Sequence, residues 1–305
     1  MTSSVKLAAS PVSWGIDFAD RPTNPPWELV LDEIQQSGMD ALELGPVGYL
    51  PEDPQRLQAA LEDRGLHAVG SFIFDDLHDP SRTAEIVATA QRACRAIAAA
   101  HGAVFVIIDR TGPERVVTAG RSSVAPRLSA ERWKELLHLT SQVADVARDH
   151  GLRPVFHPHV GGYVEFDDEI ERLMDDTDLE LCLDTGHSAY AGVDSVAAIE
   201  RYGARLSHVH FKDVAGDVLA RVVDEGLDFW TAIEHGIFCP IGEGMVDIGA
   251  VLAALDRIGY DGFATLEQDR VPGSGDALGD LRRSLDVIDE ARRALEGTPV
   301  VHGDA

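Results

Sequence analysis

The sequence is poor in cysteine, lysine and aromatic residues, and it contains no long hydrophobic run. Its three cysteines, Cys94, Cys182 and Cys239, are far apart and form no Cys-x-x-Cys pair, which argues against a disulfide framework and a zinc ribbon. No segment approaches about 18 uninterrupted apolar residues, and the first residues lack the apolar core of a secretory signal. We therefore expect a cytoplasmic protein with reduced thiols that does not insert into membranes.

Basic residues are also scarce. The 305 residues include 26 Lys and Arg against 52 Asp and Glu, which gives a formal charge of −26. Such a surface repels the phosphate backbone of nucleic acids and anionic lipid headgroups, so neither is an expected partner. The simplest interpretation of the acidic surplus is a solvated surface. The alternative is that some of the carboxylates hold a metal ion, and only their positions in the chain can separate the two.

Short apolar segments alternate with longer helical patterns along the whole chain. The expected strands are 5–13, 41–44, 68–74, 104–108, 154–157, 179–184, 206–211 and 262–267. The expected helices are 27–37, 54–64, 81–101, 129–150, 167–175, 195–202, 248–258 and 277–295. This pattern of eight strand–helix units predicts parallel βαβ units closed into a single α/β domain, a (β/α)₈ TIM barrel over residues 1–305. An open doubly wound sheet is less consistent, because no Gly-x-Gly-x-x-Gly follows the first strand.

One connection is much longer than the others. About 36 residues, at 212–247, separate the seventh strand from the next helix, where about two to six residues are usual. Strand-to-helix loops of a barrel lie on its catalytic face. This segment is therefore either a lid or substrate wall, or an arm used to form a homo-oligomer.

Histidine and carboxylate side chains gather at the ends of the last four strands. The motifs are His157-Pro158-His159, Asp184-Thr185-Gly186-His187, His208-Val209-His210-Phe211-Lys212 and Glu267-Gln268-Asp269-Arg270. A single histidine at a strand end is usually structural, but five that converge with two carboxylates are typical of a divalent metal site. Mn²⁺ or Co²⁺ suits this mixed donor set, with Zn²⁺ and Mg²⁺ as alternatives.

The order of these motifs resembles the xylose isomerase-like barrel superfamily of sugar isomerases, epimerases and dehydratases. Within it, segments 11–15, 43–49, 238–244 and 266–269 resemble the inosose (2-keto-myo-inositol) dehydratases. The resemblance implies one metal ligand from each of the last four strands, which in this chain are His157, Asp184, His210 and Glu267. It also implies that glutathione can be required, and no residue of the sequence identifies a site for it.

His157 departs from the superfamily pattern, which often has a glutamate at this position. Superfamily epimerases use two glutamates as bases on opposite faces of an enediolate, so this departure argues against two-base chemistry. The interpretation that remains is abstraction of one proton followed by loss of water from a polyhydroxy ketone, most simply inosose in inositol catabolism. A ketose 3-epimerase or sugar isomerase is the alternative enzyme, and an inactive sugar-binding barrel is the alternative outside enzymes.

The catalytic roles stay open at this point. Glu267, His159 or His187 can take the α-proton, and a protonated histidine or Lys212 can assist departure of the hydroxyl group. Lys212 is one of only three lysines, so its position at a strand end is informative. Its alternative role is an ion pair with Asp213 or Glu267.

The candidate substrate-binding residues come from several strand ends and loops. They are Trp14, Glu43, His159, His187 and Arg270. Trp14 and Glu43 are equally consistent with packing inside the barrel, where large side chains fill interior layers.

Overall fold

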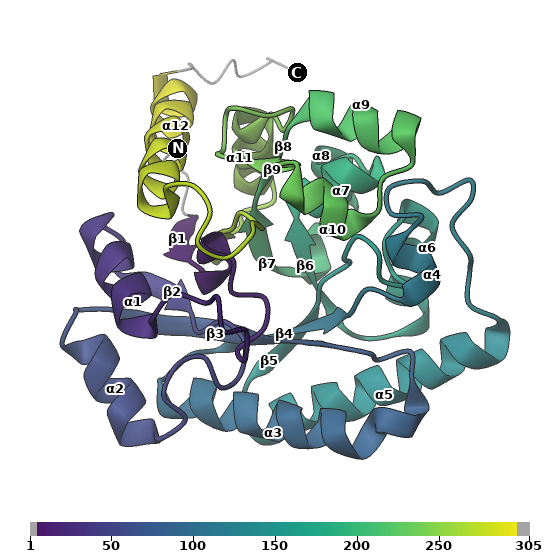
Figure 1. The fold of residues 1–305 in the computed structure, drawn as a ribbon, viewed down its shortest axis with the longest axis horizontal. Helices are drawn as coiled ribbons and strands as arrows, with labels where there is room; N and C mark the ends of the chain where they lie inside the picture. The colour runs from purple at the N-terminus through teal and green to yellow at the C-terminus, as the bar shows by residue number, and fades with distance from the viewer. Residues whose placement is uncertain (1–4, 298–305) are drawn as a thin grey trace, which may run out of the picture.

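The computed structural model describes residues 5–297, and it contains the closed barrel that the sequence predicts (Figure 1). Eight parallel strands close in the order β1-β10-β7-β6-β5-β4-β3-β2. They are β1 (Lys6–Ala9), β2 (Ala41–Glu43), β3 (His67–Asp75), β4 (Val104–Asp109), β5 (Arg153–Phe156), β6 (Glu180–Asp184), β7 (Leu206–Phe211) and β10 (Phe263–Leu266). Because at least one helix follows each strand, the prediction of a (β/α)₈ TIM barrel is confirmed.

The outer helices begin close to their predicted positions. They are α1 (Trp27–Gln36), α2 (Pro54–Glu62), α3 (Thr83–Ala99), α5 (Ala130–Asp149), α6 (Asp167–Asp176), α8 (Ser195–Tyr202), α11 (Ile248–Arg257) and α12 (Ala277–Gly297). Ser129, Asp194 and Asp247 each accept a backbone N–H in the first turn of α5, α8 and α11, which fixes these starts. Shorter helical segments lie in the connections: α4 (Pro113–Val116), α7 (Thr185–Ala191), η2 (Pro80–Arg82) and η3 (Gly203–Arg205).

The first strand is shorter than predicted, because it ends at Ala9 rather than at Ser13. Ser10 caps a 3₁₀ turn, η1 (Pro11–Trp14), by accepting a backbone hydrogen bond through its side chain. The proline that opens this turn has no backbone N–H and cannot continue the strand ladder. The strand therefore ends four residues earlier than the apolar pattern suggests, and the chain turns across the end of the barrel.

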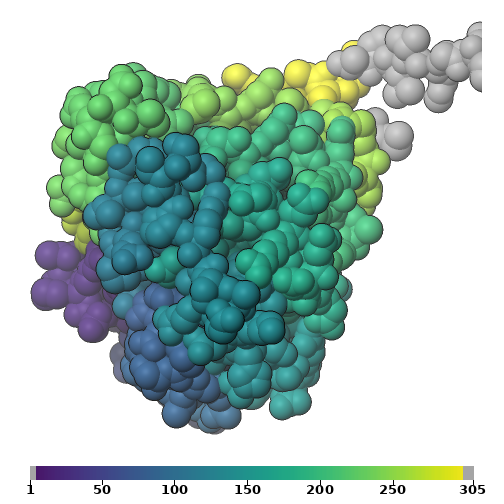
Figure 2. Space-filling model, turned by 90° about the vertical axis from the view of Figure 1, so that its right-hand side faces the viewer, coloured from purple at the N-terminus to yellow at the C-terminus, as the bar shows by residue number. Residues whose placement is uncertain are grey.

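The connection at 212–247 is folded and does not run as an extended loop. It contains β8 (Asp213–Val214), α9 (Gly216–Glu225), α10 (Phe229–Glu234) and β9 (Phe238–Cys239), and β8 pairs with β9 in antiparallel orientation. A second apolar cluster, which includes Val222 and Phe229, packs it against Tyr190 of α7. Figures 1 and 2 show α9 and α10, in green, beside residues 110–129, in blue. The segment is thus a compact wall at one side of the barrel mouth.

The strand register brings the predicted site residues to one end of the barrel. Asp184 of β6 lies opposite His210 of β7, and His210 lies opposite Thr265 of β10. Apolar side chains that include Phe72 and Val155 fill the interior. Among the helices of the described residues, none is both long and apolar enough to cross a membrane.

Candidate metal centre and active site

Four predicted residues meet at the carboxyl ends of β5, β6, β7 and β10. His157, Asp184 and His210 offer ligand atoms that all lie within 4.8 Å of one another. Asp184 Oδ2 lies 3.5 Å from His157 Nε2 and 3.7 Å from His210 Nδ1. Glu267 Oε2 lies 3.2 Å from His210 Nδ1. All four side chains are buried, so their polar atoms need partners inside the protein.

Two of these atoms, Asp184 Oδ2 and His210 Nδ1, are buried without a hydrogen bond. The other polar atoms are occupied: Asp184 Oδ1 accepts the backbone N–H of His187 at 2.8 Å, and His157 Nδ1 donates to the Pro158 carbonyl at 2.6 Å. The remaining lone pairs therefore point at a common centre. Imidazole nitrogens mixed with carboxylate oxygens fit a divalent metal ion, which His157, Asp184, His210 and Glu267 would hold.

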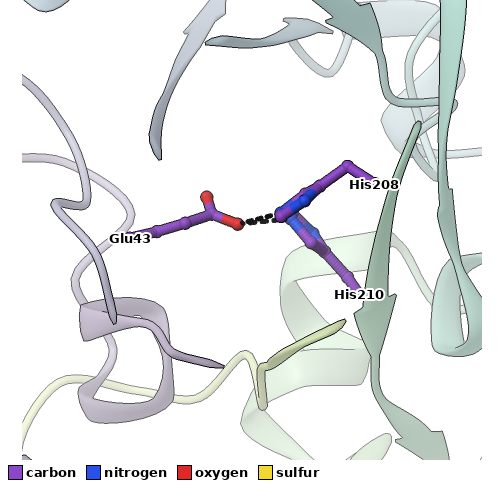
Figure 3. A group of neighbouring side chains, drawn as sticks. All are labelled: Glu43, His208 and His210. Atoms are coloured by element: carbon purple, nitrogen blue, oxygen red, sulfur yellow. Dashed lines mark hydrogen bonds and ion pairs between the residues drawn. The ribbon is translucent and has the colours of Figure 1, made fainter. Parts of the chain in front are cut away.

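Glu43 lies inside the barrel and orients one of these ligands (Figure 3). Its Oε1 accepts hydrogen bonds from His208 Nε2 at 2.7 Å and from His210 Nε2 at 2.9 Å. Because Nε2 of His210 carries the proton of that bond, its Nδ1 presents a lone pair to Asp184 and Glu267. Burial raises the pKa of the Glu43 carboxyl, but the neighbouring His210 and His208 outweigh burial and hold this pKa well below its usual range.

Glu43, His208 and His210 also have ligand atoms close enough together to hold a metal ion. The two imidazole nitrogens that face Glu43, however, are already hydrogen-bonded to its carboxylate. We therefore interpret Glu43 and His208 as groups that orient His210 for the first cluster, and not as part of a second metal centre.

Replacing Glu43 by Gln should weaken metal binding without removing a ligand. The amide cannot accept two imidazole hydrogen bonds with the strength of a carboxylate, so His210 loses its fixed orientation. We expect the affinity for Mn²⁺ to fall about 10- to 100-fold in a titration against a competing chelator. Glu52→Gln, which alters only an exposed ion pair with Arg92, is the control. An unchanged affinity in the Glu43 variant would contradict this role.

Lys212 is a buried cation among carboxylates. Its Nζ lies 2.8 Å from Asp269 Oδ1, 3.3 Å from Glu267 Oε2 and 3.4 Å from Asp184 Oδ2. Burial lowers the pKa of Lys212, but these three carboxylates outweigh burial and raise this pKa above its usual value. The stem of the side chain needs Gly186, where a Cβ would lie 2.6 Å from Lys212 Cγ. Lys212 therefore keeps its proton and supplies positive charge and hydrogen bonds, so it cannot act as a base.

Of the two ion pairs expected for Lys212, the structure contains the one with Glu267. Asp213 instead organises the loop 240–246, because its carboxylate accepts the backbone N–H groups of Gly242, Gly244 and Val246. A fully buried carboxylate satisfied by backbone donors is a structural element. These hydrogen bonds join the beginning of the segment 212–247 to its end.

The rings of His159 and His187 are in contact, with centroids 3.9 Å apart and an interplanar angle of 38°. His187 is engaged through both nitrogens: Nδ1 accepts the N–H of Val160 at 3.4 Å, and Nε2 faces Lys212 Nζ at 3.2 Å and Asp269 Oδ2 at 3.4 Å. His159 Nδ1 donates to the Val160 carbonyl at 2.8 Å, which leaves Nε2 with a lone pair. Burial lowers the pKa of both rings well below the usual value, and the charge of Lys212 lowers that of His187 further. Both imidazoles are thus neutral at neutral pH.

The imidazoles, Lys212 and Glu267 line one cavity at the mouth of the barrel. Its apolar lining includes Phe72 and Phe74 from β3 and also Phe229 and Trp230 from α10. The folded segment 212–247 therefore contributes directly to the cavity, which favours the hypothesis of a substrate wall.

Three predicted substrate-binding residues are absent from the lining of this cavity, although all of them are described. Glu43 lies beneath it. The indole of Trp14 is buried, and its Nε1 donates to Glu33 Oε2 at 2.5 Å. Arg270 lies in the loop before α12, and its Nη2 donates to Oδ2 of Asp280 in that helix at 2.7 Å. These contacts give Trp14 and Arg270 anchoring roles for the loops after β1 and β10.

Sequence reasoning missed two acidic residues of the cavity, Asp17 and Asp269. Asp269 follows Glu267 by two residues, so the strand-end motif contained a signal for it. Asp17 lies in the loop after the 3₁₀ turn, and no local pattern gives the direction of that loop.

The fold is a (β/α)₈ barrel, and its donor set is a candidate site for a divalent metal at the carboxyl ends of the strands. Residues 31–291 match the family described as the xylose isomerase-like TIM barrel, and the chain belongs to this family. It is 32% identical over 289 residues to the rhizopine catabolism protein MocC of Rhizobium meliloti, covering 90% of this chain and 85% of that protein. It is also 32% identical over 280 residues to an inosose dehydratase of Geobacillus kaustophilus, covering 88% of each.

Solved structures share the fold at low sequence identity. The IolI protein with a bound zinc atom matches with a TM-score of 0.69 at 15% identity, over 96% of this chain and 100% of that chain. Other structures with this fold are an L-ribulose 3-epimerase and a probable 3-DHS dehydratase, so the fold itself accommodates both kinds of chemistry.

Proposed function

We propose that this sugar-modifying enzyme is a metal-dependent hydro-lyase that removes water from 2-keto-myo-inositol or a related polyhydroxy ketone in carbohydrate catabolism. The observation that carries the proposal is the group of inward-facing lone pairs on His157, Asp184, His210 and Glu267, two of them buried without a hydrogen bond. The similarity to inosose dehydratases over most of the chain supports the lyase class and the substrate.

A divalent cation held by these four residues would supply a Lewis acid that acidifies the C–H group beside the ketone and stabilises negative charge on its oxygen. Mn²⁺ or Co²⁺ suits the mixed imidazole and carboxylate donors best, with Zn²⁺ and Mg²⁺ as alternatives. The zinc atom of the IolI structure supports a divalent ion in a barrel of this shape.

Side chains of the protein abstract the proton, stabilise charge and exclude water. His159 takes the α-proton through Nε2, the nitrogen that makes no hydrogen bond among the described residues. Lys212 holds a fixed positive charge beside the cavity, which stabilises negative charge on a bound substrate. The rings of Phe74, Phe229 and Trp230 cover the C–H face of a cyclic polyol and exclude water from the reacting carbons.

Ketose 3-epimerisation, the alternative, needs two bases on opposite faces of one carbon. His157 cannot be the second base, since its Nδ1 donates to a carbonyl and its Nε2 faces Asp184. One free base together with a buried cation is better suited to elimination than to epimerisation.

Chelation and metal add-back with 2-keto-myo-inositol test the proposal. We expect the dione product to absorb in the ultraviolet with Mn²⁺ or Co²⁺ present, and the signal to disappear after chelation. Metal-dependent epimerisation of a ketose without any dehydration would contradict the lyase assignment.

A further inference from the structure

Asp17 lies in the cavity of the candidate metal centre, on the loop that follows β1. It lines this cavity together with Lys212 and Glu267, and it also lines an adjoining groove that continues past Phe74 and Asp75. The carboxyl group therefore stands at the junction between the site and the outer surface. A residue at this junction can act on a bound substrate and then exchange a proton with solvent.

The loop that carries Asp17 is held in place by a close contact with the opposite end of the chain. Gly15 has φ +82°, and a Cβ at this position would lie 2.6 Å from the backbone nitrogen of Pro272. No other residue type fits both the backbone conformation and this contact. The loop after β1 consequently packs on the loop after β10, which places Asp17 near Asp269.

Asp17 and His159 both line the cavity, and the strands that precede them lie across the barrel from each other. In the closed ring, β1 and β5 are separated by three strands in either direction, so they are diametrically opposed. Asp17 follows β1 and His159 follows β5, and both line the cavity between them. A substrate bound in this cavity can therefore contact both the His159 imidazole and the Asp17 carboxyl group.

Two other proton carriers of the cavity, Lys212 and His187, are engaged by protein atoms. The ammonium of Lys212 is surrounded by three carboxylates, and His187 contacts protein atoms through both nitrogens. Asp17, within the described part of the chain, has one ion pair, with Arg21 at 3.6 Å, and no side-chain hydrogen bond. Its carboxyl group is therefore available to form a hydrogen bond with a ligand.

Burial is the main reason that Asp17 favours its protonated form. Burial and then Asp269 raise the pKa of Asp17 to about 8, with a smaller contribution from Glu267, while Arg21 and Lys212 act against this rise.

We infer that Asp17 is the general acid of the proposed dehydration and protonates the departing β-hydroxyl group. This inference rests on the proposed function. His159 takes the α-proton, the electron pair of the C–H bond forms the new C=C bond, and the C–O bond breaks as Asp17 passes its proton to the leaving oxygen. Water is released, and the Asp17 carboxylate and the His159 imidazolium return to their starting states by exchange with solvent, so no oxidant or reductant is needed.

The test compares Asp17→Asn with Asp20→Asn, a control with the same charge change at an exposed position three residues away. Three rates are measured on the metal-loaded proteins: dehydration of 2-keto-myo-inositol, exchange of its α-proton with D₂O, and fluoride release from an analogue with fluorine in place of the departing hydroxyl. Fluoride leaves without being protonated, so this third rate does not depend on a general acid.

We expect dehydration to fall about 10²- to 10⁴-fold in Asp17→Asn, while α-proton exchange and fluoride release stay close to wild type. Retained exchange also shows that the variant is folded and holds its metal. An equal loss of all three rates, or unchanged dehydration, would overturn the role of Asp17 as general acid. Neither result would bear on the proposed function. A wild-type protein that neither exchanges the α-proton nor dehydrates the ketone would refute the proposed function itself.

Discussion

Replacing Asp184 by Asn should abolish metal binding and reduce the proposed activity about 10³-fold or more. Asn keeps an Oδ1 that can accept the backbone N–H of His187. The hydrogen bond that caps α7 is therefore retained. It replaces Oδ2, which faces the cluster without a hydrogen bond, by an amide NH₂ that cannot ligate a cation. The measurement is metal content per chain after dialysis, together with kcat/KM for 2-keto-myo-inositol.

Asp194→Asn is the matched control for this prediction. Asp194 is also the N-cap of a helix, α8, and its Oδ1 accepts two backbone N–H groups, but it lies on the outside of the barrel. This variant should keep its metal and its activity. Full metal content and activity in Asp184→Asn would show that the centre lies elsewhere.

Replacing His159 by Gln should lower kcat about 10²- to 10⁴-fold and leave the metal content unchanged. The amide has neither the lone pair nor the basicity of the imidazole Nε2, while the four candidate ligands are untouched. Because removal of the α-proton is then the blocked step, exchange of this proton with D₂O should fall in parallel with dehydration. This outcome is opposite to the one expected for Asp17→Asn, in which exchange persists.

His138→Gln is the control, since His138 lies exposed on α5. It should leave dehydration and exchange unchanged. If His159→Gln lost dehydration but still exchanged the α-proton at the wild-type rate, another group would have to be the base. Glu267 would then be the first candidate, because it lines the same cavity.

The main architecture and the meeting of the strand-end side chains could be predicted from the sequence because they follow from local patterns. Strands alternating with helices specify a parallel barrel, and the carboxyl ends of parallel strands meet at one end. The side chains that follow the last four strands therefore had to converge, as His157, Asp184, His210 and Glu267 do.

The roles of Glu43 and Asp17 could not be predicted, because they depend on contacts across the barrel. Glu43 on β2 reaches His208 and His210 on β7, which is not a neighbouring strand, through the interior. Asp17 is positioned by a 3₁₀ turn and by the contact between Gly15 and Pro272. Neither the reach of a side chain nor the packing of two distant loops has a periodic signature in the sequence.

The folded wall at 212–247 is a different case, because part of its pattern was available. Val218 and Val222 are spaced four residues apart and are both buried in α9, which is the spacing of a helix face. We expected a long loop because residues 212–247 do not show the alternation of strand and helix patterns found in the rest of the chain. What the pattern does not contain is the direction of α10, which turns Phe229 and Trp230 toward the cavity.

Anomalous diffraction from crystals grown with Mn²⁺ tests the central claim most directly. We expect one strong peak, about 2.0–2.3 Å from His157 Nε2, Asp184 Oδ2, His210 Nδ1 and a carboxylate oxygen of Glu267. A peak between Glu43, His208 and His210, or no peak inside the barrel at all, would contradict it.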